Sequence, residues 1–528
     1  MTIDENLTIY KMFHNSASRF PENRAIEYLD RAYTYAEAER EADAMARGLV
    51  ALGIEKGEFV GIISENSDRF LLAFLAVEKI GAVSVLIGKK LKDSEISALL
   101  KDTGVTRLIY GNGSVNDGAE GRGITERFSG MRSYISLEEC DNGETVSLGR
   151  LKQLGDAIPE AAAEREVRGS DTDVVLFTSG TTGREKGVLT THAARANLSY
   201  CLALEQRAGP SDKFCVMLPV HHCFSLSSCV LAALSVGACV CFTRDHHAES
   251  VLWQIENSKC TVLTSVPTLF SVLADRQEEK HYDLSSLRTG MIGGSTYSPE
   301  IFRRICGVLG FNLLPSLGQT EATAGMTSAG YDDPLDVKEK TVGHFLEGIE
   351  GRIFLRDSEK EARTGQIGEI CIRGYTVMLG YLGNPELTKK TIDSKGWLHT
   401  GDVGYLDGSG NLHMVGRIKD IIIRGGENIA AAEIENIIAA DPRVEQVRVL
   451  GVPDAYYIEE ICACVITREK MSENDVRSIV SSQLADFKVP KYVLFFDDFP
   501  LLDSGKICTA RLQEQVKRRL ESDKGMRC

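Results

Sequence analysis

The sequence lacks a hydrophobic run long enough to cross a bilayer. Its longest apolar stretch, at about residues 229–242, is shorter than the roughly 20 residues that a transmembrane helix needs. Residues 1–25 lack the basic segment followed by an apolar core that marks a secretory signal peptide. We therefore expect no transmembrane segment and a cytoplasmic location. Residues 229–242 are expected to form a buried helix that runs into a strand.

The sequence also has no C-x-x-C pair and no cluster of cysteine and histidine with zinc-finger spacing. Most of its 14 cysteines lie in apolar strings, where a cysteine behaves as a small hydrophobic residue. This pattern predicts a reduced protein with free thiols.

Positive charge is in deficit, because 60 lysines and arginines stand against 75 aspartates and glutamates, a formal net charge of −15. Proteins that bind nucleic acid usually carry a basic surface. We therefore expect no nucleic-acid partner, although a local basic site for phosphates remains compatible with this charge.

Alternating apolar and amphipathic segments predict an α/β fold. A chain of 528 residues is too long for one ordinary core, so we expect two or more domains. Apolar residues recur at helical spacing from Tyr33 to about Leu52 and at 69–80, and short apolar runs at Phe59–Ile63 and 82–87 indicate buried strands. Strands between helices are typical of βαβ units and parallel sheets. The pattern returns at 213–244, 260–275 and 287–315.

The other segments differ. Residues 111–170 are polar and glycine-rich, and we expect a loop-rich excursion there. Short strands with a hairpin turn at Asp407 are expected between about 350 and 410. A compact α+β pattern follows from 420, with helices near 431–440 and 472–485 and strands near 446–451, 461–466 and 492–497.

These patterns predict a large N-terminal domain of parallel and mixed sheets flanked by helices, at 1–417, and a small α+β C-terminal domain at 418–528.

A Gly/Ser/Thr-rich segment, Phe177-Thr-Ser-Gly-Thr-Thr-Gly-Arg-Glu-Lys-Gly187, follows the apolar run Val174–Leu176. Glycine lets a backbone turn tightly and approach a ligand, and successive N–H groups in such a turn form an anion site. Lys186 adds a mobile positive charge that suits a phosphate. The segment is not a Walker A loop, because Glu185 and Gly187 break that pattern. On its own it is compatible with a phosphate loop or with a flexible surface turn.

Seven further motifs follow this segment in a fixed order. They are Leu218-Pro-Val-His-His222, Ser316-Leu-Gly-Gln-Thr-Glu321, Gly368-Glu-Ile-Cys-Ile-Arg-Gly374, Gly396-Trp-Leu-His-Thr-Gly-Asp402, Gly416-Arg-Ile-Lys-Asp420, Arg424-Gly-Gly-Glu-Asn428 and Ser504-Gly-Lys506. With them the sequence resembles, over nearly its whole length, the adenylate-forming superfamily of acyl-CoA synthetases, adenylation domains and luciferases.

The resemblance implies that ATP activates a carboxylic acid to an acyl-adenylate and that pyrophosphate leaves. It implies that the Gly/Ser/Thr-rich loop holds the pyrophosphate, through Thr178, Ser179, Gly180, Thr181, Thr182, Gly183 and the catalytic Lys186. Thr320 is expected to donate to the α-phosphate. Glu321 is expected to bind Mg²⁺, because hard cations prefer carboxylate and phosphate oxygens.

The resemblance also implies a nucleoside site. Asp402 is expected to accept the ribose hydroxyls, with Arg417 beside it. The adenine is expected between two short segments, whose residues are Gly293, Gly294 and Ser295 on one side and Leu317, Gly318 and Gln319 on the other. Leu317 stands where the family usually has an aromatic residue that stacks on adenine, so weaker packing is expected.

In the family the small C-terminal domain is mobile and rotates between the two half-reactions. Lys506 is the expected catalytic lysine of adenylation, and Lys419 matches the hinge. Gly425 and Gly426 are expected to line the approach of the thiol, where close backbone passage favours glycine. Thr509 stands where an arginine often follows the lysine.

The acid site is expected to border residues 219–229, with the catalytic His222 between the acyl group and the phosphates. Phe224-Ser225 lacks the aspartate that pairs with the ammonium of an amino-acid substrate, and burying an unpaired ammonium is costly. Cys223 replaces the asparagine that contacts a 2-hydroxyl in aryl-acid enzymes, so an apolar fatty or aromatic acid remains. Two further departures are Leu86 and Gly88, where the family commonly has proline and asparagine.

Three functions stay open at this level. The first is an acid–CoA ligase that uses ATP, Mg²⁺, coenzyme A and a small carboxylic acid. The second is an adenylating enzyme that loads the phosphopantetheine of a carrier protein in trans. The third, a degenerate nucleotide-binding regulator, is disfavoured because Lys186, Glu321, Asp402, Arg417 and Lys506 are all present.

Overall fold

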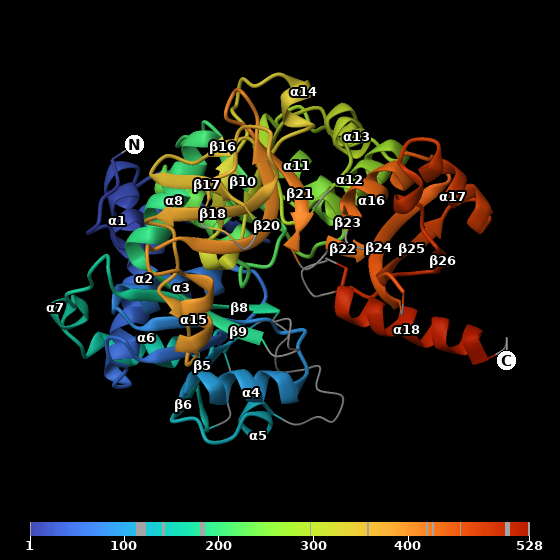
Figure 1. Cartoon of the computed structure of the whole chain (residues 1–528). Helices are drawn as coiled ribbons and strands as arrows, with labels where there is room; N and C mark the ends of the chain where they lie inside the picture. Colours follow the sequence, from blue (N-terminus) through green and yellow to red (C-terminus); the bar gives the residue numbers. More distant parts are fainter. Residues whose placement is uncertain are drawn as a thin grey trace.

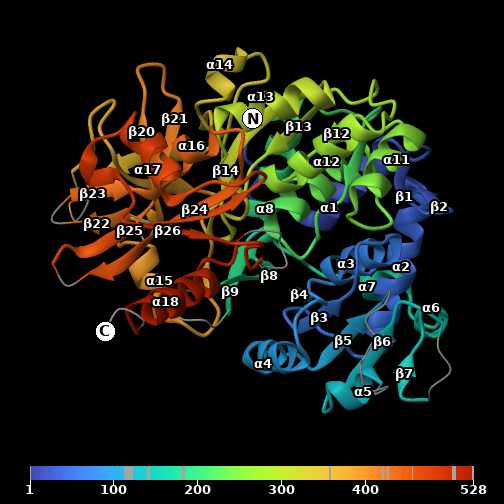
Figure 2. The ribbon, with the colours of Figure 1, turned by 90° about the vertical axis from the view of Figure 1, so that its right-hand side faces the viewer.

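The computed structural model describes residues 2–111, 123–139, 143–179, 185–295, 297–355, 358, 360–418, 421–424, 427–454, 456–501 and 507–525. Within them the chain forms four sheets, three in the first 417 residues and one after it (Figures 1 and 2). The expected α/β fold with a large N-terminal and a smaller C-terminal unit is confirmed. The boundary at 417/418 stays a prediction.

An eight-stranded sheet with a parallel centre carries the strands on both sides of the Gly/Ser/Thr-rich loop. Its order is β19 (Gly380–Tyr381), β9 (Glu185–Thr191), β8 (Thr172–Ser179), β4 (Val83–Ile87), β3 (Phe59–Ile63), β5 (Arg107–Tyr110), β6 (Ser133–Ser136) and β7 (Thr145–Val146). The segments between these strands, and the segment after β19, form five helices: α4 (Asp93–Thr103), α5 (Ile124–Arg127), α6 (Leu148–Asp156), α7 (Glu160–Ala163) and α15 (Pro385–Thr391).

A nine-stranded sheet lies next to it in the N-terminal part. Its order is β16 (His344–Phe345), β15 (Gly325–Ser328), β14 (Asn312–Gly318), β13 (Thr289–Ile292), β12 (Val262–Leu263), β10 (Lys213–Val216), β11 (Cys239–Phe242), β1 (Arg24–Tyr28) and β2 (Arg31–Thr34). Its helices are α1 (Ile9–Arg19), α8 (His192–Glu205), α9 (Cys223–Ser225), the π-helix η1 (Leu226–Leu231), α10 (Ala232–Ser235), α11 (Ala248–Ser258), α12 (Pro267–Glu279), α13 (Pro299–Leu309) and α14 (Leu335–Lys338).

Two helices form the layer between these sheets. Helix α3 (Asp68–Lys79) is apolar on every face between its charged ends, from Phe70 to Val77, as a buried helix should be, and it contacts both β4 and β1. Helix α2 (Tyr35–Ala51) begins at a capping box in which Thr34 and Glu37 satisfy each other's backbone N–H groups, and it packs against α3 and β1. The two sheets therefore share one continuous core.

The third sheet is antiparallel and comprises β17 (Ile349–Phe354), β18 (Gly368–Gly374), β20 (Leu398–Leu406) and β21 (Leu412–Arg417). The C-terminal sheet comprises β22 (Ile421–Arg424), β23 (Glu427–Ala430), β24 (Val444–Asp454), β25 (Ile458–Thr467) and β26 (Tyr492–Phe495), with α16 (Ala431–Ala439), α17 (Glu473–Ser481), the 3-10 turn η4 (Asp486–Lys488) and α18 (Thr509–Gly525). Helix α16 packs against β21, which joins the two parts (Figure 2).

Most sequence-based elements are confirmed, including the hairpin turn at Asp407 between β20 and β21 and the buried helix that runs into β11. The expectation of a loop-rich segment at 111–170 is wrong in part, since five short elements from α5 to α7 lie there. They were hidden because each is short, and because α6 is held by tertiary packing against α2.

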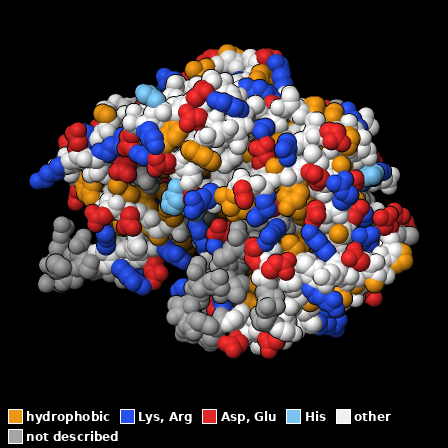
Figure 3. All heavy atoms as spheres, turned by 180° about the vertical axis from the view of Figure 1, so that it is seen from behind, with side chains coloured by type: hydrophobic (Ala, Val, Ile, Leu, Met, Phe, Trp, Pro, Cys, Tyr) orange, Lys and Arg blue, Asp and Glu red, His pale blue; other side chains and the backbone are white. Residues whose placement is uncertain are grey.

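Every cysteine in the described ranges is a free thiol. No helix among the described residues is both long and apolar enough to span a membrane. On the face seen in Figure 3, basic and acidic side chains are interspersed, so the net negative charge is spread over this surface.

A buried carboxyl, Glu78, lies where α3 meets the strands and α8. Its Oε1 accepts a hydrogen bond of 2.7 Å from Ser84, and its Oε2 lies 3.4 Å from Nδ1 of His192. Burial, and then the nearby Asp173, raise the pKa of Glu78 well above its ordinary value, while burial lowers the pKa of His192. Both groups are therefore held neutral in the folded protein at neutral pH.

We expect Glu78→Gln to stabilise the protein relative to wild type by an amount that grows with pH. Above the ordinary glutamate pKa of 4.5 the unfolded chain releases the Glu78 proton while the folded chain keeps it, so wild-type stability falls as pH rises. The difference should change by up to about 1.4 kcal/mol per pH unit. Urea unfolding of both proteins between about pH 5 and about pH 8 measures it. A pH-independent difference would contradict the assignment.

Candidate active site

The predicted pyrophosphate loop connects two antiparallel strands. Thr178 and Ser179 end β8, and Lys186 lies near the start of β9, directly opposite Thr178. Gly180, Thr181, Thr182 and Gly183 lie outside the described residues. The hairpin register therefore places Lys186 beside the first hydroxyl of the loop.

A tyrosine links Lys186 to the predicted magnesium ligand. Tyr381 on β19 pairs with β9, its hydroxyl donates a 2.8 Å hydrogen bond to Oε1 of Glu321, and its ring lies 5.3 Å from Nζ of Lys186. Burial, followed by the charge of Glu321, raises the pKa of Tyr381, so the phenol stays protonated as a donor. Lys186 and Tyr381 also border a cavity of about 340 Å³.

Thr320 and Glu321 lie on the 3-10 turn η2 (Thr320–Ala322) directly after β14. Thr320 donates to Sγ of Cys223 at 3.4 Å, which connects the turn to the segment that precedes the π-helix. The turn ends at Thr323, whose φ of +65° is costly for a β-branched residue. Thr323 donates to the Thr376 carbonyl at 2.7 Å, a contact that helps to hold this conformation.

A buried arginine supports the same turn. Arg195 on α8 pairs with Asp173 on β8 at 2.5 Å and donates to Thr190 on β9 at 2.6 Å. Its remaining nitrogen reaches Ser227 on the π-helix at 3.1 Å and the Thr323 carbonyl at 3.4 Å. One side chain thus ties the strands of the predicted pyrophosphate loop to the turn that carries Glu321.

The predicted ribose residues face each other in the third sheet. Asp402 on β20 is directly opposite Arg417 on β21, and Nε of Arg417 lies 2.9 Å from Oδ1 of the fully buried Asp402. The turn η2 packs against β8, β9 and β20. The structure therefore gathers the loop strands, Glu321 and the strand of Asp402 around one short turn.

The two predicted adenine segments also meet. A side chain at Gly293 would come within 2.6 Å of the Ser316 carbonyl oxygen, so this position requires glycine. Gly294 and Ser295 are exposed, whereas Leu317, Gly318 and Gln319 are partly buried. Nε2 of Gln319 is buried, and no residue in the described ranges accepts a hydrogen bond from it. This open donor fits an acceptor nitrogen or oxygen of a ligand.

The predicted acyl segment begins at a loop held by Asn66, which bonds the backbone of Leu218 and Val220 at 2.8 and 3.0 Å. His222 lies at the N-terminal end of α9, and its ring is 4.4 Å from the ring of His221. The π-helix that follows is a rare element that often occurs at functional sites.

His221 explains one departure from the family pattern. A side chain at Gly88 would come within 3.0 Å of Nε2 of His221, so the imidazole occupies the space that the usual asparagine would take. Burial and then the neighbouring His222 lower the pKa of His221 well below its ordinary value, which leaves it neutral.

Four predicted site residues, Lys419, Gly425, Gly426 and Lys506, lie outside the described residues. The strands that flank the two glycines form a hairpin in which Arg424 pairs with Glu427. Leu501 and Ile507, on either side of the Lys506 segment, form an antiparallel bridge.

Comparison with known proteins identifies the family of the chain. The AMP-binding enzyme family matches residues 13–382, and the AMP-binding enzyme C-terminal domain matches residues 433–506. The chain belongs to the AMP-binding enzyme family. This confirms the resemblance to adenylate-forming enzymes and the expected class, an AMP-forming acid–thiol ligase.

Two relatives and one solved structure illustrate the similarity. YngI of Bacillus subtilis, which is named as an acyl-CoA synthetase, is 33% identical over 96% of this chain and 97% of its own length. The mitochondrial medium-chain acyl-CoA ligase ACSF2 of Homo sapiens is 30% identical over 97% of this chain and 88% of its own. ATP-bound MatB from Rhodopseudomonas palustris has a TM-score of 0.86 at 28% identity, covering 97% of this chain and 99% of that one.

Sequence reasoning missed two residues of this AMP-binding enzyme. Tyr381 lies between glycines in a segment typical of a turn, and only the pairing of β19 with β9 brings it to Glu321. Arg195 is charged and lies on a helix, where the usual expectation is an exposed side chain. The one signal for Arg195 is that the residues around it, 194–199, are otherwise small, polar or apolar without a charged face.

We expect Tyr381→Phe to lower the apparent affinity for Mg²⁺ by about 10- to 100-fold, because a side chain that orients a metal ligand has an effect of this size. The Mg²⁺ dependence of acid-dependent pyrophosphate exchange measures it. AMP binding without Mg²⁺ should stay near wild type.

Tyr375→Phe is the matched control for this variant. Tyr375 packs in the same core cluster as Tyr381, and its buried hydroxyl has no hydrogen-bond partner among the described residues. Equal Mg²⁺ dependence in the two variants would contradict a specific role for Tyr381.

Proposed function

We propose that this AMP-binding enzyme is an acid–CoA ligase for an apolar carboxylic acid. The observation that carries the proposal is the packing of η2 against β8, β9 and β20, which brings Glu321, Lys186 and the Asp402–Arg417 pair into one neighbourhood. The relatives described above carry the names acyl-CoA synthetase and acyl-CoA ligase, which favours coenzyme A over a carrier protein as the thiol.

In the first half-reaction a carboxylate oxygen attacks the α-phosphorus of ATP, and the bond to the β-phosphate oxygen breaks to release pyrophosphate. The two reactants are both anions, so cations and donors around the phosphates lower the barrier. Thr320 is proposed to hold the α-phosphate. The leaving pyrophosphate is proposed to be held by the loop residues Thr178, Ser179, Gly180, Thr181, Thr182, Gly183 and Lys186. Lys506 is proposed to stabilise the charge that develops between the acid and the α-phosphate.

Glu321 is the proposed ligand of Mg²⁺. Its carboxylate is partly exposed, and it is oriented from one side by the Tyr381 hydroxyl. A carboxylate of this kind suits Mg²⁺, which binds through one or two carboxylates plus substrate phosphates. When bound, the ion neutralises phosphate charge.

The nucleoside is proposed to lie between β13, β14 and the third sheet. Asp402 is fully buried and already paired with Arg417, so its carboxylate is held in place to accept two ribose hydroxyls. The Gln319 amide, whose Nε2 has no acceptor among the described residues, would donate to the adenine. The adenine would be bordered by Gly293, Gly294, Ser295, Leu317 and Gly318.

The acid is proposed to bind beside α9 and η1, with His222 toward the phosphates. Phe224 packs against the core cluster that contains Val266. Its ring lies close to Gly293, since a Cβ atom added to this glycine would be 3.5 Å from the ring. Residues 219–229 contain no acidic side chain to pair with an ammonium. ACSF2, a relative, is a medium-chain ligase, which supports an apolar acid of similar character.

In the second half-reaction the thiol sulfur of coenzyme A attacks the carbonyl carbon of the adenylate, and AMP leaves with the bonding electron pair. We propose that residues 418–528 rotate about Lys419 between the two steps, so that Lys506 leaves the site and Gly425 and Gly426 face the thiol.

The free thiols of the described cysteines support a reducing, cytoplasmic location.

A substrate screen tests the proposed reaction directly. Pyrophosphate release should rise with fatty or aromatic acids, fall to background with amino acids, and yield an acyl-CoA only when coenzyme A is present. Turnover that increases only with a phosphopantetheinylated carrier protein would overturn the choice of thiol. No response to any acid would overturn the proposed activity.

Two lysine variants should separate the half-reactions. Lys506→Ala should lower acid-dependent pyrophosphate exchange by about 10² or more, as loss of a positioned charge stabiliser does, and leave thioester formation from supplied acyl-adenylate nearly unchanged. Lys419→Ala should slow the second step more than the first. Lys517→Ala, an exposed lysine on α18, is the control. Equal losses in both steps for either variant would contradict its assignment.

A further inference from the structure

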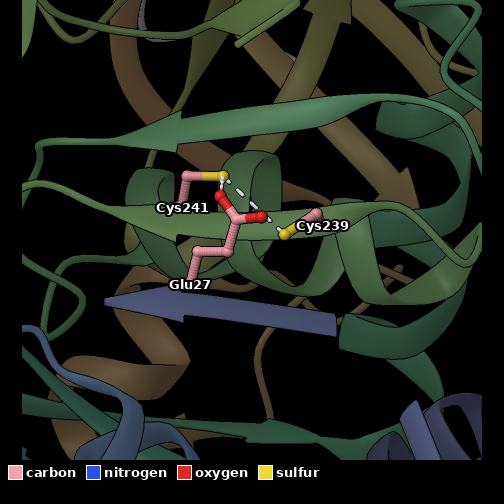
Figure 4. Close-up of side chains that lie close together, drawn as sticks. All are labelled: Glu27, Cys239 and Cys241. Carbon is pink, nitrogen blue, oxygen red and sulfur yellow. Dashed lines mark hydrogen bonds between the residues drawn. The ribbon is translucent and has the colours of Figure 1, made fainter. Parts of the chain in front are cut away.

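A cluster of two thiols and a carboxylate lies on one face of the nine-stranded sheet, on elements that the reaction does not use. Glu27 on β1 is directly opposite Cys241 on β11, and Cys239, two residues earlier on β11, points to the same face (Figure 4). Because side chains two apart on a strand share a face, both thiols project into the core cluster that includes α11, and Glu27 lies beside them on the neighbouring strand.

The spacing of the three ligand atoms suits one cation. The Sγ atoms of Cys239 and Cys241 are 3.7 Å apart, Oε2 of Glu27 is 3.5 Å from Sγ of Cys241, and the atoms lie within 4.8 Å of one another. Two sulfurs bound tetrahedrally to zinc at about 2.3 Å are about 3.8 Å apart. The thiol pair therefore already has the separation of two zinc ligands.

A lysine orients the carboxylate. Nζ of Lys213 lies 2.8 Å from Oε1 of Glu27, which leaves Oε2 facing the thiols. Such outer partners fix the direction of a metal-binding carboxylate. Glu27 and Lys213 remain 20% and 31% exposed, so the carboxylate end of the cluster reaches solvent while the thiols are buried.

We propose that Glu27, Cys239 and Cys241 form a binding site for a zinc-class divalent cation, separate from the nucleotide site. Two thiolates and a carboxylate match zinc and cadmium, whereas magnesium and calcium prefer oxygen ligands only. Each bound ion forms two metal–sulfur bonds and releases two thiol protons to solvent.

The consequence is a cross-link within the sheet. Strand β1 comes from the first 30 residues, whereas β11 follows the acyl segment, so a shared ion would join parts of the chain that are about 210 residues apart in sequence. A cation that binds only the folded protein stabilises it by mass action.

Another pair of cysteines provides a matched control. Cys462 and Cys464 on β25 have the same one-residue spacing and are fully buried. Among the described residues they belong to no group of three close metal-binding side chains. One other group of this kind lies on β18 and β20, the latter being the strand of Asp402, and is the competing location: Glu369, Cys371 and His399.

The test uses the full-length, reduced, metal-free protein. Cd²⁺ is titrated with the ultraviolet thiolate-to-cadmium absorption as readout, and Zn²⁺ by competition with a chromophoric chelator. Wild type and the Cys462→Ser/Cys464→Ser control should each bind one equivalent of the metal ion. Their thermal unfolding midpoints should be higher with the ion than without it. Cys239→Ser and Cys241→Ser should lose the cadmium band. Lys213→Met should weaken binding by about 10- to 100-fold.

Several outcomes would overturn the proposal. They are no binding by wild type, an unchanged cadmium band in Cys239→Ser and Cys241→Ser, loss of the band in the Cys462→Ser/Cys464→Ser control, or loss of the band in Cys371→Ser. If the buried cysteine variants do not fold, Glu27→Gln decides the matter, because this partly exposed side chain is replaced by a neutral group of the same shape. Unchanged Zn²⁺ affinity in Glu27→Gln would then overturn the site.

Discussion

The buried ion pair between Asp173 and Arg195 is the interaction on which the rest of the site depends. Removing two charges from water is costly, and the pair is tolerable because the guanidinium also reaches Thr190, Ser227 and the Thr323 carbonyl. These partners belong to a strand of the predicted pyrophosphate loop, the π-helix and the turn after β14. A change in any one of these elements is therefore felt by the other two, since satisfied buried networks are rigid.

This rigidity answers the main electrostatic problem of the proposed reaction, which is the approach of two anions. Donors and cations that are already in place need no reorganisation when charge develops. We propose that the described part of the site supplies them from the N-terminal part of the chain, through Lys186, Thr320 and Arg417. The groups assigned to the C-terminal domain are proposed to serve steps that alternate, and a separate small sheet suits that role.

Much of the fold could be predicted because the local signals agree with each other. The capping box at Thr34, the apolar runs of β3 and β4 and the turn at Asp407 are each encoded within a few residues. Residues 123–163 were misjudged because short elements with little periodicity form only against a partner, as α6 does against α2. The candidate site shows the same difference between local and tertiary information. The motif residues can be recognised in the sequence, whereas Tyr381 and Arg195 join the site only through tertiary contacts.

The sequence alone was sufficient for the family, the α/β class and the identity of the motif residues, because these depend on residue type at fixed spacing. It could not show that Tyr381 orients Glu321, that His221 fills the space beside Gly88, or that Glu27 faces two thiols from a strand about 210 residues away. Those contacts arise when sheets pair and stack. Sheet pairing joins strands regardless of their separation along the chain, and no local pattern records which strands will meet.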